Sequence, residues 1–481
     1  MWRSRVDRGW YSSQHMNLSK NDLGVLLPAV ALVMIGVAVQ ATGRGMHGSL
    51  VASETLRWVG VLGLAVYAVK RRTLTPWIFV AMVAGAEIGF DAPGFAVGLR
   101  VFSDIFLRLI RTIVAPLILA TLVTGIAGHG DLKGVGRMGI KSLIYFEVLT
   151  TLALVIGLVA INISKAGVGL TLPASGGATE TLAKVEPTHW QDFLLHVFPD
   201  NIAKSIAEGQ ILQVAVFAVF FGIALASLPA EKGAPVLRLC ESLSEVMFKF
   251  TNVVMYFAPI GVGAAMAFTV GHMGLGVLVN LGKLLLTLYA ALAAYGLFVM
   301  LPVALVAGVP VKRFLAAVAE PATIAFATAT SEAALPRAME AMEALGVPRR
   351  IVSFVIPAGY SFNLDGSTLY LALASVFVAQ AAGVPMTWGE QLFMMGTLIL
   401  TSKGVAGVPR ATLVVLLATA ATFRLPTEPI FVILGIDALM DMGRTMVNVV
   451  GNCLASAVVA RWEGQFDLEE LDEVVAEGLA D

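Results

Sequence analysis

Residues 392–423, with the sequence LFMMGTLILTSKGVAGVPRATLVVLLATAATF, contain two short apolar runs separated by a glycine-rich segment. As helices, the runs 392–400 and 413–423 would each cover about 14–17 Å, roughly half of the ~30 Å hydrocarbon core of a bilayer. The glycines and the proline between them cannot continue a lipid-facing helix, so protein must shelter them. We therefore predict a re-entrant helical hairpin over 390–425, and a second one over 311–345, where TSEAALP interrupts the apolar sequence.

The composition of the whole chain places these hairpins in a membrane protein. Of the 481 residues, 58% are hydrophobic and 14% are charged, whereas soluble domains carry ~25% charged residues. Runs such as 24–41 and 284–306 are long enough to cross a bilayer. We expect an all-α polytopic fold with about ten spanning helices beside the two hairpins. The spans are expected at 24–42, 53–69, 75–93, 101–127, 141–164, 193–228, 236–262, 275–308, 351–379 and 428–460.

The same composition argues against several classes of function. The net charge is −1 and there is no long basic cluster, so nucleic acid is not an expected partner. Cys240 and Cys453 lie in apolar segments and allow no disulfide framework, and the six histidines show no metal-binding spacing. The sequence contains no GxSxG motif, so it gives no support for an intramembrane enzyme. We expect no metal ion and no other cofactor.

The loop charges orient the two hairpins. With the N-terminus in the cytoplasm, most Lys and Arg residues of the short loops fall on the cytoplasmic side of the cell (inner) membrane. Both termini are then cytoplasmic, and the hairpins enter from opposite sides. Each hairpin precedes a helix with a polar centre, at Asp365 and Asp441, and the tips share ALPRA (334–338) and GVPRA (407–411). Inverted repeats with broken helices are typical of secondary transporters, although ion channels also contain re-entrant loops.

The last predicted span, 428–460, carries a polar stripe on one helical face. Its members are spaced by three or four residues and are Asp437, Asp441, Arg444, Asn448 and Asn452, with Thr445 beside them. A charged side chain at mid-membrane costs ~2.5–3.5 kcal/mol on insertion scales, so these groups must face a partner or a water-filled cavity. We interpret the stripe as a ligand-facing surface. The alternative is an Asp441–Arg444 salt bridge that only ties helices together.

The preceding long span contains SFNLDGSTLY, residues 361–370. Polar residues and a glycine at this depth predict a locally unwound segment, in which Asn363 and Asp365 bind a cation or a proton. A kink with no binding role is the alternative.

Another span contains YFEVLTT, residues 145–151, with Glu147 in an apolar helix and Thr150 and Thr151 about one turn further on. A glutamate within a membrane helix is expected to be protonated or hydrogen-bonded. We predict that Glu147, Thr150 and Thr151 contribute to ion coupling, and a purely structural role is the alternative.

The tip of the first hairpin carries Thr330, Ser331 and Glu332 between two half-helices. Hydroxyl groups and free backbone N–H groups at the N-terminus of a half-helix suit an anionic ligand. Glu332 would oppose an anion unless it is protonated or turned away, and for this residue a helix cap is the alternative.

These motifs resemble the dicarboxylate/amino acid:cation symporter family, which includes the excitatory amino acid transporters and bacterial proton–glutamate and C4-dicarboxylate symporters. The resemblance, nearest to the bacterial proton–glutamate symporters, extends over residues 75–462. By this resemblance, 1–74 would be an N-terminal extension with two extra membrane helices, and 463–481 an acidic cytoplasmic tail. The resemblance to the family is most specific in four stretches, SEAALPRAMEAMEALGVPRR, IPAGYSFNLDGSTLYLALASVFVAQ, TSKGVAGVPRATLVVL and ILGIDALMDMGRTMVNVVGN.

The resemblance implies a glutamate-transporter-like fold that forms a homotrimer. A scaffold, residues 75–127 and 193–262, would hold a transport domain, residues 141–164 and 275–460, that carries substrate across the membrane like an elevator. The bilayer, a substrate and a coupling cation are therefore the expected partners.

The resemblance also implies a substrate site between the hairpin tips and the last helix. Arg444 would pair with the side-chain carboxylate of an acidic amino acid, and Asp441 would accept from its amino group. The other contacts would come from Ser331, Thr445, Asn448 and the backbone around Val408 and Pro409. The expected function is import of glutamate or aspartate. The alternative is a C4-dicarboxylate symporter, whose substrate has no amino group.

Three positions differ from the pattern of sodium-driven relatives, which typically have methionine at the position of Leu364, aspartate at Asn452 and tyrosine at Glu147. Without a carboxylate at position 452, a sodium site is weakened, and a buried glutamate is more easily protonated. We therefore expect proton coupling through Glu147, lying near Asp365, with Glu332 as the reserve candidate. Sodium coupling is the alternative.

Overall fold

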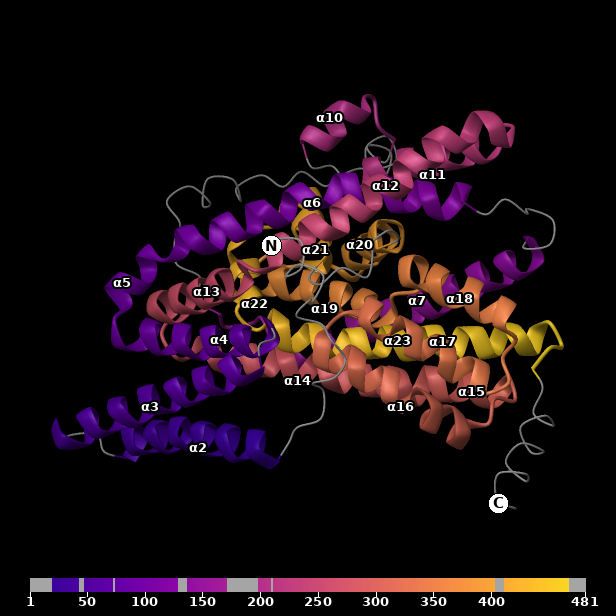
Figure 1. Ribbon diagram of the computed structural model, residues 1–481. Coiled ribbons are helices and arrows are strands. Elements are labelled where there is room, and N and C mark those ends of the chain that lie inside the picture. Colours follow the sequence, from indigo (N-terminus) through magenta and orange to yellow (C-terminus); the bar gives the residue numbers. More distant parts are fainter. Residues whose placement is uncertain are drawn as a thin grey trace, which may run out of the picture. The chain divides into compact units, whose positions relative to one another are not determined.

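The computed structural model describes residues 20–42, 47–71, 74–128, 136–170, 198–208, 211–402 and 411–466. Throughout these ranges the regular structure is helical and contains no strand, as expected for an all-α protein (Figure 1). The chain divides into two compact units. Unit 1 comprises Met1–Leu109, Val253–Leu281 and Phe431–Ala438, and unit 2 comprises Ile110–Asn252, Gly282–Ile430 and Leu439–Asp481.

Within the described residues, five helices are long and apolar enough to cross a membrane, and a sixth is added if one bent helix pair counts as a single span. They are Leu74–Asp91, Pro93–Thr124, Met138–Ser164, Val277–Val306 and Arg349–Ala381, and the bent pair is Glu231–Met255 with Ala258–Met273. These helices establish a multi-pass architecture. The larger number of spans expected from the sequence stays a prediction.

Several segments expected as continuous spans consist of two helices. In the segment 193–228, α10 (Ile202–Ala207) is followed by α11 (Ile211–Ala226). The segment 236–262 is divided between α12 (Ala230–Met255) and α13 (Ala258–Met273). Pro259, in the first turn of α13, has no N–H with which to continue the hydrogen bonds of α12, which explains the break.

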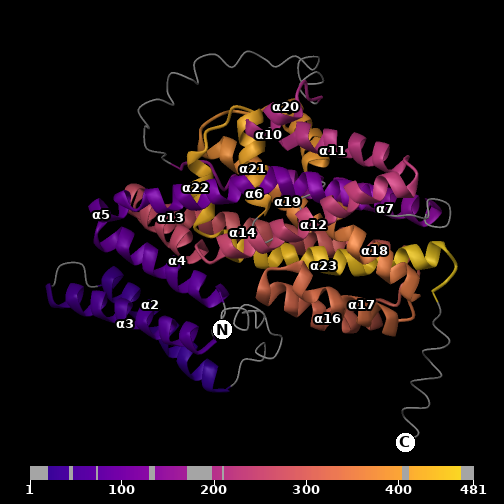
Figure 2. The ribbon, with the colours of Figure 1, turned by 45° about the horizontal axis from the view of Figure 1, so that its top comes forward.

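In unit 1, two N-terminal helices pack against each other through small residues. Helix α2 (Lys20–Thr42) and helix α3 (His47–Arg71) lie side by side in both ribbon views (Figures 1 and 2). A side chain at Gly60 would place its Cβ 2.5 Å from Val33 Cγ2, so only glycine permits this approach. The hydroxyl of Ser53 donates to the carbonyl of Gly36 at 2.8 Å and adds a polar tie.

A buried ion-pair cluster joins α3 to α4 (Leu74–Asp91). Arg57 is only 4% exposed; its guanidinium pairs with Glu87 and, at 2.8 Å, with Asp91, and lies over the ring of Phe90. The indole N–H of Trp58 donates to the second oxygen of Asp91 at 2.9 Å. Helix α4 in turn packs closely on α13, where a Cβ at Gly89 would lie 2.6 Å from a carbonyl oxygen. The N-terminal helix pair is therefore fastened to α4 by charge as well as by packing.

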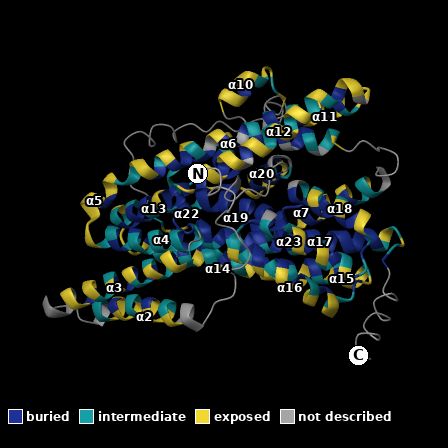
Figure 3. Cartoon of the chain, viewed as in Figure 1, coloured by how far each residue is buried: buried dark blue, intermediate teal, exposed yellow. Residues whose placement is uncertain are grey.

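Unit 2 is built around α19 (Asp365–Ala381), in which every residue except Gln380 is buried. Figure 3 shows this helix in dark blue, together with much of α23 (Asp437–Trp462). Helix α7 (Gly136–Ser164) packs along α19, and at its end a Cβ at Gly167 would lie 2.6 Å from the carbonyl oxygen of Phe377.

The next helices of unit 2 along the chain include those of the first segment predicted as a hairpin. Helix α14 (Val277–Tyr295) continues through the π-helix η3 (Gly296–Met300) into α15 (Leu301–Val306). Helices α16 (Val311–Thr328) and α17 (Ser331–Ala344) pack side by side, joined by Ala329 in a left-handed conformation (φ 50°) and Thr330 (Figures 1 and 2).

Helices α20 (Trp388–Thr401) and α21 (Ala411–Thr422) also contact each other and flank residues 403–410, which lie outside the described residues. Each of the two segments predicted as a hairpin therefore contains two helices, and their re-entrant character stays a prediction. Their entry into the membrane from opposite sides stays a prediction.

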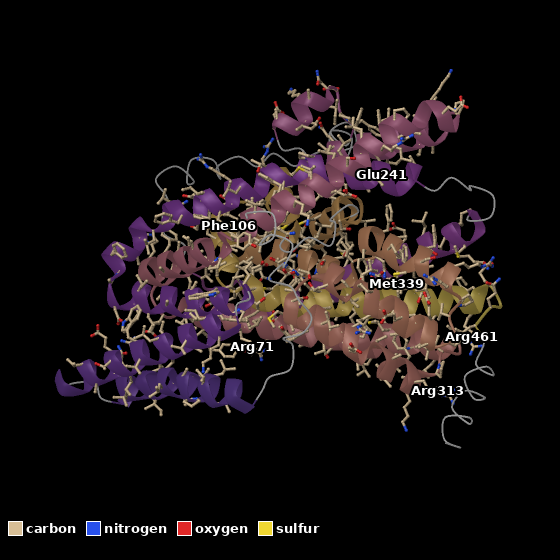
Figure 4. The ribbon with its side chains drawn as sticks, viewed as in Figure 1. Arg71, Phe106, Glu241, Arg313, Met339 and Arg461 are labelled. Atoms are coloured by element: carbon tan, nitrogen blue, oxygen red, sulfur yellow. The ribbon has the colours of Figure 1, made fainter. Side chains whose placement is uncertain are left out.

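The C-terminal end of α23 is held by neighbouring segments of unit 2. Arg461, which is labelled in Figure 4, donates to the carbonyl of Gly308 at 2.7 Å and lies over the ring of Phe466. Lys141, near the start of α7, pairs with Glu463 at 2.6 Å. These contacts fix the helix that carries the predicted polar stripe.

We predict that Arg57→Met destabilises the protein strongly, because Glu87 and Asp91 would be left buried without their cation, a change that typically costs ~3–5 kcal/mol. Replacing all three charges, as Arg57→Met/Glu87→Gln/Asp91→Asn, should restore most of the loss. Thermal unfolding of the purified protein in detergent measures both effects. The control is Arg337→Met, since the Arg337 side chain is 57% exposed in its pair with Glu340 and should contribute little. Equal unfolding temperatures for Arg57→Met and the unmodified protein would contradict this role of the cluster.

Candidate functional site

The helix that contains NLDG is interrupted at the place where unwinding is expected. Helix α18 (Arg349–Phe362) ends just before Asn363, and α19 begins at Asp365. Asn363 and Leu364 have non-helical backbone angles, and all three residues are buried. Asp365 therefore stands in the first turn of α19, where the partial positive charge of a helix N-terminus stabilises a carboxylate.

The polar stripe of α23 is buried along its whole length. Its buried members are Asp437, Asp441, Arg444, Thr445, Asn448 and Asn452. Polar groups at such depth need partners, so their contacts define the site.

Two asparagines of the stripe connect α23 to the interrupted helix. The side-chain oxygen of Asn448 accepts from the backbone N–H of Ser367 at 3.2 Å, and its nitrogen donates to the Ser367 hydroxyl at 2.9 Å. One helical turn later, the oxygen of Asn452 accepts from the side-chain nitrogen of Asn363 at 3.0 Å. These amide contacts fix the position of the unwound segment on α23.

Glycines allow the two elements to come this close. A Cβ at Gly451 on α23 would lie 2.7 Å from a carboxylate oxygen of Asp365, and Gly366 on α19 faces the backbone of Arg444. Larger residues at either position would push the carboxylate or the helix away.

Arg444 is fully buried and engages both a carboxylate and an aromatic ring. Its Nε donates to Oδ1 of Asp441 at 2.8 Å, and the hydroxyl of Thr445 donates to the same oxygen at 3.4 Å. The guanidinium lies 4.3 Å from the centroid of the Tyr370 ring, a cation–π geometry. The salt bridge considered as an alternative from the sequence therefore exists. It does not by itself decide whether the stripe also faces a ligand.

The predicted residues of the hairpin tips are only partly placed. Ser331 begins α17 and is buried, as is Thr330. In the described part of the chain, no hydrogen bond joins Ser331 to the polar stripe. The side chain of Glu332 lies outside the description, and so do Val408 and Pro409.

The expected burial of Glu147 is wrong. Glu147 is exposed on α7, on the stripe that also contains Ile144 and Val148, whereas Thr150 is fully buried and faces the interior. The hydroxyl of Thr151 donates to the backbone carbonyl of Glu147 at 2.7 Å, a contact within the helix. Because exposed positions repeat every three to four residues along α7, a glutamate at position 147 is directed away from the buried Asp365.

Sequence reasoning missed one aromatic residue of the site. The ring of Tyr370 lies against the guanidinium of Arg444. Tyr370 belongs to the quoted motif NLDGSTLY, about one and a half turns after Asp365, so its spacing could have placed it on the face towards α23.

Residues 74–462 match the sodium:dicarboxylate symporter family. The chain belongs to this family. A proton/sodium-glutamate symport protein of Bacillus caldotenax is 41% identical over 408 residues, which cover 83% of this chain and 97% of the relative. A proton/glutamate-aspartate symporter of Escherichia coli (strain K12) is 43% identical over 371 residues, covering 76% and 85%. A C4-dicarboxylate transport protein of Solibacter usitatus (strain Ellin6076) is 43% identical over 404 residues, covering 82% and 94%.

Family membership confirms the resemblance of the motifs. The protein is a membrane-embedded symporter of the dicarboxylate/glutamate type and not an enzyme. The family match begins at residue 74, so helices α2 and α3 precede it. The interrupted helix and the polar stripe both lie within the matched region.

For this symporter, we predict that Gly451→Ala lowers cation-driven uptake at least severalfold, because the new methyl group would displace the carboxylate of Asp365. The matched control is Gly282→Ala on α14, where nothing lies within 4 Å of the added Cβ. That change should be neutral or slightly stabilising, since alanine favours a helix over glycine by ~1 kcal/mol. Initial rates of labelled glutamate uptake into proteoliposomes provide the measurement. Wild-type rates in Gly451→Ala would show that the position of Asp365 is unimportant.

Proposed function

We propose that this symporter imports an acidic amino acid, glutamate or aspartate, together with protons across the cell (inner) membrane. The observation that carries the proposal is the buried Arg444–Asp441 pair on α23. A guanidinium beside a carboxylate is complementary to a substrate that carries both a carboxylate and an ammonium group. The names of the glutamate and glutamate-aspartate symporters among the relatives support the same substrate class.

The pair would exchange partners when substrate binds. The side-chain carboxylate of the substrate would take the guanidinium of Arg444, and Asp441 would accept from the ammonium group. Thr445 and Asn448 flank this position on α23. The main-chain carboxylate of the substrate would be held by N–H and hydroxyl donors at Ser331, where α17 begins, and by the backbone around Val408 and Pro409.

Charge balance favours an amino acid over a C4-dicarboxylate, the substrate class in the name of another relative. A dicarboxylate that took Arg444 would leave Asp441 buried without a cation, and it would add two negative charges to the site. A buried charge left unpaired costs several kcal/mol. An ammonium group on the substrate removes this cost.

For the coupling ion, the buried carboxylate is Asp365 rather than Glu147. We assign the coupling role to Asp365, with Asn363, Asn452, Thr150 and Thr151 as its polar neighbourhood. The neutral amide of Asn452 provides less negative charge for a sodium ion than a carboxylate would, which favours a proton. Glu332 stays the reserve candidate for the proton.

The transport cycle that we propose is the elevator movement of this family's fold within a homotrimer. The moving part would comprise residues 141–164 and 275–460, and the scaffold residues 75–127 and 193–262. The N-terminal residues 1–74 would extend the scaffold, and 463–481 would form a cytoplasmic tail.

We predict that Asp441→Ser abolishes glutamate and aspartate uptake while succinate still competes for the site, because Arg444 remains available to a carboxylate. Arg444→Cys should lose both the uptake of glutamate and aspartate and the competition by succinate. Labelled substrates in proteoliposomes test both variants, after size-exclusion chromatography has shown that they are folded. If succinate is the better substrate of the unmodified protein, the dicarboxylate alternative replaces the proposal.

We predict that an inward proton gradient drives glutamate accumulation in sodium-free proteoliposomes. Asp365→Asn should abolish accumulation, because an amide cannot take up a proton. Glu147→Gln, which changes an exposed side chain in the same way, should keep it. A strict requirement for sodium would contradict proton coupling. Loss of accumulation in Glu147→Gln but not in Asp365→Asn would return the carrier role to Glu147.

A further inference from the structure

The helix that carries the polar stripe is supported by α14 on the side opposite the stripe. The hydroxyl of Tyr289, on α14, donates to the backbone carbonyl of Leu439, on α23, at 2.8 Å. The ring of the same tyrosine packs against Gly443, where an added Cβ would lie 3.0 Å from Cζ of Tyr289 and 3.2 Å from Cδ1 of Leu292. Glycine at position 443 therefore lets α14 come close enough for the hydroxyl to reach the backbone of α23.

The positions of these contacts around α23 show that Tyr289 does not face the ligand. A helix turns by about 100° per residue, so Leu439 and Gly443 lie within about 40° of each other. The stripe residues Asp441, Arg444 and Asn448 point about 140–200° away from Leu439. Tyr289 therefore holds α23 from behind, and any effect on a substrate has to pass through the helix.

The first turns of α23 depend on such contacts for their position. Helix α22 (Glu428–Leu434) ends just before α23, which begins at Asp437. The ends of helices fray, so the first turns need support from neighbouring elements. The carbonyl that accepts from Tyr289 belongs to Leu439, the third residue of α23, and Asp441 follows two residues later.

On the stripe side, the same part of α23 is held by α19. A Cβ at Gly366 would collide with the backbone of Arg444, so α19 lies directly against α23 there. Both amide atoms of Asn448 bond Ser367. The turns that carry the Arg444–Asp441 pair are thus held from both sides. Loss of the Tyr289 hydroxyl would remove one fixed point, next to Asp441, and leave the contacts of α19 in place.

We propose that Tyr289 is a positioning residue for substrate binding, whose hydroxyl holds the Leu439 carbonyl and thereby fixes the turn of α23 that presents Asp441. The inference rests on the proposed function, in which Asp441 accepts from the ammonium group of the substrate. Leu439 is two residues from Asp441 and five from Arg444, so the bond acts more on the carboxylate than on the guanidinium. Its loss should therefore weaken the binding of an amino acid more than that of a dicarboxylate.

The test compares Tyr289→Phe with Thr287→Val, two changes on α14 that each remove one hydroxyl. The hydroxyl of Thr287 donates to the carbonyl of Lys283 at 2.7 Å, a bond within α14, which makes it the matched control. Labelled glutamate uptake into proteoliposomes gives the KM and the maximal rate for each protein. Inhibition of this uptake by succinate gives its inhibition constant, and unfolding temperatures are recorded in detergent.

We expect Tyr289→Phe to raise the KM for glutamate roughly two- to tenfold, the effect of losing one hydrogen bond. The maximal rate and the inhibition constant of succinate should stay within about twofold of the wild-type values, because the change weakens binding of the ammonium group alone. Thr287→Val should leave all three values unchanged. A wild-type KM in Tyr289→Phe, or equal increases in the KM for glutamate and the inhibition constant of succinate, would overturn the assignment.

A second variant, Tyr289→Leu, separates the hydroxyl from the ring. If the hydroxyl positions Asp441, phenylalanine and leucine at position 289 both raise the KM for glutamate. A normal KM with phenylalanine and a raised KM with leucine would show a packing role only, and would also overturn the proposal. Failure of the proposed function would be visible in the unmodified protein, which would import no glutamate or would prefer succinate, whereas a wrong role for Tyr289 would appear only in the variants.

Discussion

The ion pair between Arg444 and Asp441 is the interaction on which the organisation of the site depends. A guanidinium with no exposed surface can stay charged only if a carboxylate compensates it, and Asp441 does so from one turn away on the same helix. Tyr370 then covers the guanidinium, and this contact brings α19 against α23. A substrate with both charges can replace each partner in turn at little electrostatic cost.

The need to compensate a buried guanidinium with carboxylates also explains the arrangement of charges in a second region, far from the site in sequence. Arg57 on α3 is as deeply buried as Asp441, and Glu87 and Asp91 on α4 compensate it. Here the charges connect two helices, and no polar stripe accompanies them. A buried ion pair alone therefore does not mark a binding site. At Arg444 the additional features are the hydroxyl and amide groups that continue along the same helical face, and the interrupted helix beside them.

The sequence predicted those parts of the structure that produce a regular spacing of polar residues or contain a helix-breaking motif. Polar residues spaced by three and four identified the buried face of α23, and NLDG identified the break between α18 and α19. A single polar residue in an apolar helix does not show which side of the helix it lies on, because the lipid-facing and protein-facing sides are equally hydrophobic. Glu147 was for this reason assigned to the wrong face.

The first turns of α19 bring the residues that we propose for ion coupling and those that contact Arg444 into one short segment. Asp365 lies next to Gly451, Ser367 is held by Asn448, and Tyr370 lies against Arg444. From residue 365 to residue 370 a helix rises only about 7.5 Å, so a displacement at one end is transmitted to the other. An ion that changes the orientation of Asp365 would therefore also change the distance between Tyr370 and Arg444. If Asp365 takes the coupling ion and Arg444 the substrate, as we propose, the first turns of α19 connect the two binding events.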